Sequence, residues 1–333
     1  MGEIITLDYG SGGRKTAQLI EEVLLTAFAN TALAPLGDGA VLPDLGGPPV
    51  FSTDSFVVSP WRFPGGDIGK LAVCGTVNDV CMAGGVPKHL SFSLILEEGF
   101  PLDDVKAIAA SAARTARQAG VQIVTGDTKV VERGRGDGVY INTAGVGVLR
   151  APGLGREALR AGDAVLVSGS VGCHGAAVLM ARGGLPCEGA LRSDCRPLHE
   201  LAAAALDAGG VRMLRDPTRG GVATTLNEFV EGLPLGIELD EEAVPVDEPV
   251  DAACALLGLD PLYAACEGRL LAVCAPERAG AVLAALRALP GGEGAARIGQ
   301  VTAARPGQVV LRNAFGGSRI LGKLTGAQLP RIC

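Results

Sequence analysis

Strand-like and helix-like segments alternate along both halves of this 333-residue chain, and this alternation constrains the fold more than any other feature. Apolar segments of strand length cover residues 50–58, 89–96, 121–124, 139–149, 164–167, 270–273 and 296–311. Segments with helical spacing and helix-end signals cover residues 15–30, 66–84, 101–119, 197–208, 221–231 and 276–289. A mixture of this kind in both halves predicts an α/β or α+β protein.

A turn-rich segment at residues 151–155, Ala-Pro-Gly-Leu-Gly, separates the two halves. The length suggests about two domains. We therefore predict an N-terminal domain over residues 1–152 and a C-terminal domain over residues 153–321. Residues 322–333 carry no strong pattern and have Pro330 close to their end, which favours a flexible C-terminal tail that carries Cys333.

The composition excludes several classes of protein. Apolar residues make up 48% of the chain, enough for a substantial core. The 49 glycines follow no collagen period, and a net charge of −7 with 4% aromatic residues argues against non-specific nucleic-acid binding. No apolar run approaches the roughly 18 residues of a membrane span, and the acidic N-terminus does not resemble a secretion signal. We expect a cytoplasmic protein with no membrane or nucleic-acid partner.

Nine cysteines without Cys-X-X-Cys spacing predict neither a disulfide framework nor a zinc site. Most of them stand in apolar contexts, where cysteine acts as a small hydrophobic residue. Cys333 differs because it is the last residue, where a thiol is accessible and can move between sites. The alternative is an incidental exposed thiol.

Aspartates recur beside small or turn-forming residues, at Asp38, Asp54, Asp79, Asp127 and Asp216. Mg²⁺ prefers such hard oxygen ligands and often accompanies phosphates, whereas small neighbours let a ligand approach the backbone. The pattern favours a metal–phosphate site. Each aspartate could instead form an ordinary turn or cap, and spacing alone cannot show that they converge.

Two further charged residues lie in unusual contexts. Lys129 follows an apolar strand and the residues Gly-Asp-Thr. It could orient a phosphate or carboxylate, or could simply extend from the edge of a strand. Glu267 has apolar neighbours and could act as a general base, or could pair with Arg269. Neither a P-loop nor a Rossmann fingerprint is present, so any nucleotide is bound by another architecture.

Together these segments resemble the HypE family of hydrogenase maturation factors, within the aminoimidazole-ribotide-synthetase-like superfamily of ATP-using enzymes. The terminal Pro-Arg-Ile-Cys of residues 330–333 is the motif most specific to HypE. The resemblance spans nearly the whole chain. The segments that carry it are residues 53–55, 67–70, 75–80, 82–87, 126–130, 216–221 and 330–333.

The resemblance implies an α/β N-terminal domain whose strands form a barrel across a homodimer. It also implies an α+β C-terminal domain beside it and a cleft that holds ATP and Mg²⁺. It implies that Cys333 receives a carbamoyl group from HypF and that this group is dehydrated with ATP to a thiocyanate, Lys129 and Glu267 being catalytic. The cyano group would pass to iron on a HypC–HypD complex. The implied ATP and phosphate contacts are Asp38, Asp54, Asn78, Asp79, Gly126, Asp127, Thr128 and Asp216, with Asp38, Asp54, Asp79 and Asp216 as metal ligands.

Three other readings remain open. Selenophosphate synthetase shares the expected fold but carries a reactive residue in an N-terminal glycine-rich segment, whereas the first cysteine here is Cys74. Thiamine-phosphate kinase shares the Gly-Asp-Thr motif but needs no terminal cysteine. A non-catalytic carrier scaffold would use the tail only for docking, and the aspartates would then have no shared task.

Overall fold

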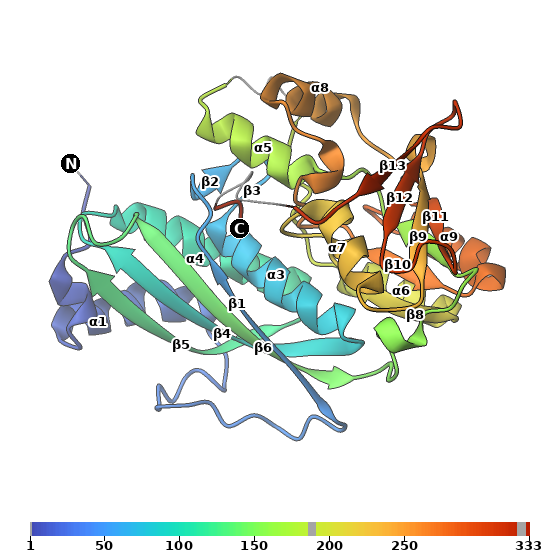
Figure 1. The fold of residues 1–333 in the computed structure, drawn as a ribbon. Helices are drawn as coiled ribbons and strands as arrows, with labels where there is room; N and C mark the ends of the chain where they lie inside the picture. The colour runs from blue at the N-terminus through green and yellow to red at the C-terminus, as the bar shows by residue number, and fades with distance from the viewer. Residues whose placement is uncertain (1, 186–190, 325–330) are drawn as a thin grey trace.

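The computed structural model describes residues 2–185, 191–324 and 331–333. Cys187, one of the nine cysteines, and Pro330 lie outside these residues. Two sheets dominate the described chain, and helices pack between and around them (Figure 1). Within the described ranges, no helix combines the length and the apolar character that a membrane span needs.

The first domain is built on a four-stranded sheet in the order β1-β6-β4-β5. Strand β6 alternates buried and half-buried residues along nearly its whole length, as expected for a strand with one face on a core. Helices α3 and α4 pack on this sheet and on each other (Figure 1). The bounds are β1 Pro49–Phe56, β4 Gly85–Glu97, β5 Gln122–Val131, β6 Val139–Leu149, α3 Ile68–Met82 and α4 Leu102–Gln118.

A helical stretch precedes this sheet, and a short hairpin lies between β1 and α3. The predicted helix over residues 15–30 is confirmed as a continuous stretch with a π-helical middle. The bounds are α1 Arg14–Leu19, the π-helix Ile20–Leu25, α2 Thr26–Phe28, β2 Arg62–Phe63 and β3 Gly66–Asp67.

The second domain contains a seven-stranded sheet in the order β13-β12-β9-β11-β7-β10-β8. The pair β9–β12 is parallel, and the other neighbours in this sheet are antiparallel. The strands are β7 Ala164–Val167, β8 Val211–Arg215, β9 Gly236–Asp240, β10 Leu271–Cys274, β11 Ala296–Thr302, β12 Val309–Arg312 and β13 Ser318–Leu321. The helices are α5 Cys173–Arg182, α6 His199–Ala208, α7 Gly221–Val230, α8 Glu248–Leu257 and α9 Ala279–Arg287.

Residues of the two domains share one apolar cluster. It joins buried side chains of α3 and α4 to buried side chains of α6, α9 and β10. Asn78, fully buried on α3, strengthens this junction: its amide nitrogen donates to the Arg196 carbonyl at 3.2 Å, and its oxygen accepts from the Leu198 amide at 2.8 Å. The predicted boundary at residue 152 falls between β6 and β7.

The expectation that cysteines in apolar segments act as small hydrophobic residues is confirmed for the described residues. Seven cysteines are buried and reduced, and Cys333 is half-buried. Burial raises the pKa of the Cys274 thiol to about 11, so this thiol is a poor nucleophile at neutral pH.

Candidate active site

Three of the predicted aspartates converge where β1, α3 and the loop after β8 meet. Asp54 lies on β1, Asp79 in the last turn of α3 and Asp216 directly after β8. Asp79 accepts a hydrogen bond from the Ser52 hydroxyl at 2.8 Å. Helix α3 can approach β1 closely because residue 75 is glycine: a Cβ there would lie 2.9 Å from the Phe56 ring.

The three carboxyl groups perturb one another. Asp216 is only 4% exposed, and burial, followed by the charges of Asp79 and Asp54, raises its pKa to about 7. Burial also raises the pKa of Asp79, and the nearby Asp54 raises it further. The pKa of Asp54 is raised by burial as well. Carboxylates held together in this way favour a cation, which would relieve their repulsion.

A cavity of about 410 Å³ opens beside Asp79 and Asp216. This volume lies within the usual range of small-molecule sites. Other residues that line it are Phe51, Ser52, Met82, Leu154, Met213 and Arg215. The described residues contain no ready-made group of three metal-binding side chains. The oxygen donors nevertheless suit Mg²⁺, which is usually held by one or two carboxylates together with phosphate and water.

Glu267 lies behind this cluster and is only 1% exposed. Burial raises its pKa well above the ordinary value, and the charges of Cys195 and Asp216 act in the same direction. Among the described residues its Oε1 atom has no hydrogen-bond partner. A buried carboxyl oxygen without a partner is costly, and such groups mark functional sites.

The alternative reading of Glu267 as the partner of Arg269 is wrong. Arg269 lies beside Asp194 instead, with 3.8 Å between Nε and Oδ2. Asp194 also accepts the backbone amide of Gly268 at 3.1 Å and that of Glu267 at 3.4 Å. Asp194 therefore holds the backbone of Glu267, and the Glu267 side chain keeps its oxygen available.

The C-terminal end of the chain lies at this same site, between the two sheets (Figure 1). Burial raises the pKa of the Cys333 thiol, and the charges that act on it come from Glu267, Arg219, Asp54 and Asp216. The terminal thiol therefore lies within electrostatic range of the buried carboxylates.

Backbone hydrogen bonds hold the tail in this position. The Cys333 carbonyl accepts the Val57 amide at 3.1 Å, and the Arg331 carbonyl accepts the Ser59 amide at 3.3 Å, so the tail runs antiparallel to residues 57–59. The Ile332 side chain is 2% exposed and joins the shared apolar cluster. The Arg331 guanidinium pairs with Asp137 and lies over the Tyr140 ring.

Arg219 is a site residue to which the sequence analysis assigned no role, although the motif containing it was recognised. It lies in the turn between β8 and α7, where Gly220 and Gly221 have φ angles of +78° and +59°. A Cβ at Gly221 would lie 2.5 Å from the Leu262 carbonyl, so this turn requires glycine. The turn brings the Arg219 cation within range of Cys333 and Asp54. Its positive charge partly offsets the rise in pKa that burial causes at both groups.

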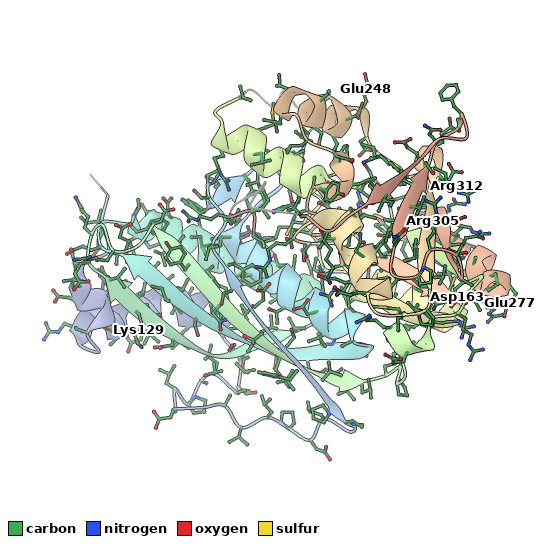
Figure 2. All side chains as sticks on the ribbon, in the orientation of Figure 1. Lys129, Asp163, Glu248, Glu277, Arg305 and Arg312 are labelled. Carbon is green, nitrogen blue, oxygen red and sulfur yellow. The ribbon has the colours of Figure 1, made fainter. Side chains whose placement is uncertain are left out.

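Lys129 and Asp127 lie elsewhere in the chain. Both are on β5, which is at the opposite edge of the four-stranded sheet from β1, roughly 14 Å away across three strand spacings. The Lys129 ammonium pairs with Asp127 at 2.5 Å, and both side chains are more than half exposed. Figure 2 shows Lys129 at the end of this sheet away from the second domain. One chain alone does not bring Lys129 to Glu267.

The remaining residues predicted to contact the nucleotide are either exposed or have a structural role of their own. Asp38 is exposed in the segment before β1. Gly126 is required by the close approach of β4, because a Cβ there would lie 2.2 Å from the Phe92 carbonyl. Thr128 is buried on β5, and the Asn78 amide is occupied by the hydrogen bonds between domains. Their nucleotide contacts stay predictions.

Comparisons with known proteins agree with this architecture. Residues 36–149 match the family described as AIR synthase related protein, N-terminal domain, and residues 160–312 match the corresponding C-terminal domain family. The two-domain fold and its carboxylate-lined cleft therefore define an AIR-synthase-type protein.

Comparison with individual relatives identifies the family within this class. The carbamoyl dehydratase HypE of Cupriavidus necator is 54% identical over 332 residues, which cover 99% of this chain and 95% of the relative. A crystal structure of hydrogenase maturation protein HypE in complex with ATP superposes with a TM-score of 0.95 at 50% identity, covering 98% of this chain and 99% of that one. A HypE–HypF complex gives a TM-score of 0.80 at 43% identity, covering 92% and 99%. The chain belongs to the HypE family of carbamoyl dehydratases.

Proposed function

We propose that this chain is an ATP-dependent carbamoyl dehydratase whose substrate is its own C-terminus. An S-carbamoyl group on Cys333 would lose one water and become a thiocyanate, which supplies cyanide for the iron centre of [NiFe]-hydrogenase. The observation that carries this proposal is the position of the Cys333 thiol beside Glu267, Arg219 and the aspartates. The resemblance to HypE relatives over the full length supports the same reaction.

The reaction converts R–S–C(=O)NH₂ and ATP into R–S–C≡N, ADP and phosphate. ATP supplies a phosphoryl group, so that the carbamoyl oxygen leaves with phosphate. The residues of the chain must then remove the protons on nitrogen and stabilise negative charge on oxygen. Glu267 is suited to take up a proton because burial has already raised its pKa. Arg219 offers a positive charge beside the same sulfur.

Mg²⁺ is the expected companion of the nucleotide. Asp54, Asp79 and Asp216 would hold it, together with phosphate oxygens, and the metal would neutralise charge on the transferred group. Asp38 would join them only after its exposed segment moves toward the cluster. ATP binding has direct support from the HypE relative solved with ATP.

A homodimer would explain the position of Lys129. Strands β1 and β5 are the outer strands of the four-stranded sheet in the described chain. Pairing β1 of each copy with β5 of the other would close a barrel and remove both open edges. A Lys129 and an Asp127 from one subunit would then approach the cleft of the other, where Lys129 could act with Glu267.

Partner proteins follow from the same reaction. HypF would place the carbamoyl group on Cys333, in line with the HypE–HypF complex solved for a relative. A HypC–HypD complex would accept the cyano group, in the cytoplasm. Transfer in both directions requires Cys333 to leave its docked position, so the flexible tail expected over residues 322–333 is part of the proposal.

Removal of the terminal thiol tests this function. Cys333→Ala should bind ATP as the wild type does but form no thiocyanate after incubation with HypF, carbamoyl donor and ATP. A cyano product from Cys333→Ala would overturn the proposal. A wild-type protein that binds partners and leaves ATP unhydrolysed would instead favour the carrier scaffold. Phosphate transfer to thiamine phosphate or to selenide would favour the kinase or the selenophosphate synthetase.

A further inference from the structure

His174, a buried histidine of α5, contacts the tail directly. Its ring is fully buried and perpendicular to Phe63, with 5.2 Å between the ring centroids. Its Nε2 atom lies 2.8 Å from the carbonyl oxygen of Ile332, and its Nδ1 atom lies 2.8 Å from the Ser193 hydroxyl. The sequence alone gives no sign of this role, because the other partner of the bond is 158 residues away.

The hydrogen-bond partners of His174 determine which ring nitrogen carries the proton. A carbonyl oxygen only accepts, so Nε2 must carry hydrogen and donate to Ile332. Burial lowers the pKa of His174, which keeps the ring neutral at physiological pH, and Nδ1 must then accept from Ser193. The Ser193 oxygen also accepts the Cys195 amide at 3.1 Å, and the Ser193 amide donates to the Pro64 carbonyl at 2.8 Å. This network fixes the tautomer of the ring in which Nε2 donates to the tail.

The backbone carbonyls of the last three residues are all bound. Backbone amides of residues 57 and 59 hold the two outer carbonyls. Two side chains of the described residues donate to tail carbonyls, and both come from α5: Arg182 donates to Arg331 at 2.6 Å, and His174 donates to Ile332. His174 is therefore the donor for the carbonyl next to the reactive residue, and without it that buried carbonyl would be left unpaired.

We propose that His174 is a positioning residue whose hydrogen bond to Ile332 holds the tail in its docked position; we call this hydrogen bond the latch. The latch sets how far Cys333 is available for dehydration in the docked tail or for carbamoyl transfer in the released tail. This inference rests on the proposed function. A docked tail presents Cys333 to Glu267 for dehydration, whereas a released tail exposes the thiol to a carbamoyl-transferring partner. Weakening the latch should therefore slow dehydration and make the thiol more reactive toward external reagents. The two rates are compared on folded variants only, because general unfolding would also expose the thiol and slow dehydration.

The burial of Cys333 supports a difference in thiol reactivity between the docked and the released tail. Its pKa is raised by burial and by Glu267 in the docked state. Because the thiolate is the reactive form, the docked thiol should react slowly with alkylating agents, and most alkylation should pass through the released tail. The alkylation rate is then a measure of docking that is independent of the dehydration chemistry.

The test compares His174→Leu, which cannot donate, with His174→Gln, whose amide can. His199→Leu is the matched control, since His199 is a half-buried histidine on α6 with no hydrogen bond to the tail. Iodoacetamide labelling of Cys333 is followed on the peptide of residues 324–333, which cleavage after Lys323 releases. Dehydration is followed in a single turnover of the carbamoylated full-length protein with ATP.

We expect His174→Leu to label about tenfold faster and to dehydrate about tenfold slower, the scale set by one buried hydrogen bond. His174→Gln should recover most of both rates, and His199→Leu should match the wild type. Unchanged labelling in a folded His174→Leu would overturn the latch, as would both rates falling together. If His174→Leu does not fold, Ser193→Ala should shift both rates in the same directions by about threefold. If the wild type labels slowly but never dehydrates, the proposed function fails while labelling still decides the latch.

Discussion

Replacing Glu267 with glutamine tests the proposed proton acceptor at the centre of the site. Glutamine keeps the shape of the side chain but removes the titratable oxygen. Glu267 is 1% exposed and has an Oε1 atom without a hydrogen-bond partner in the described chain, so Glu267→Gln should not break a structural contact. The loss of a general base typically costs about 10²–10⁴ in rate, which corresponds to roughly 3–5 kcal/mol of transition-state stabilisation.

The assay is a single turnover of S-carbamoylated Glu267→Gln with ATP, followed by intact mass spectrometry. We expect dehydration to slow by at least about a hundredfold, with ATP affinity close to wild type and thermal stability no lower than wild type. The matched control is Glu277→Gln, on the far side of the second domain, which should behave as wild type (Figure 2). A dehydration rate within about fivefold of wild type would refute the role of Glu267 as proton acceptor.

Three further predictions follow from the site. Asp216 has a pKa of about 7, against 3.8 for an ordinary aspartate, so the folded protein binds more protons between these values and loses stability as the pH rises through them. In Mg²⁺-free buffer, the free energy of unfolding of Asp216→Asn should therefore rise above that of the wild type between pH 5 and 8, by up to about 4 kcal/mol. Chemical denaturation at several pH values measures this difference, and a difference that does not change with pH would contradict the prediction. Asn78→Ala should lower the free energy of unfolding by about 1–3 kcal/mol because it leaves the Leu198 amide unpaired, and an unchanged denaturation midpoint would count against that junction. Mixing inactive Lys129→Ala with inactive Glu267→Gln should restore about a quarter of wild-type activity if each site takes one residue from each subunit; no recovery after subunit exchange would exclude a shared site.

Much of the fold could be predicted because local pattern and tertiary structure agree. The strand at residues 164–167 and the helix at 221–231 have uniform apolar or amphipathic patterns and flanking glycines, and they were found nearly to the residue. Local sequence patterns did not predict β2, α5, α8, β8, β9 or β13. These elements are short, and packing against neighbours rather than sequence periodicity stabilises them.

The site was predictable only in its residue types. Asp54, Asp79 and Asp216 stood out by context, but their convergence depends on α3 crossing β1 at Gly75, which no local pattern encodes. The sequence also could not show that β5 lies at the opposite sheet edge, which separates Lys129 from Glu267 in one chain. Strand order is decided by long-range pairing and is invisible to a reading of neighbouring residues.

The most direct test of the central claim is the intact mass of the carbamoylated protein before and after ATP. If Cys333 carries the substrate, ATP and Mg²⁺ should remove the mass of one water from the modified C-terminal peptide of residues 324–333, and omission of ATP should leave it unchanged. A modification that keeps its full mass in the presence of ATP, or a loss of water on any peptide other than this one, would contradict the account.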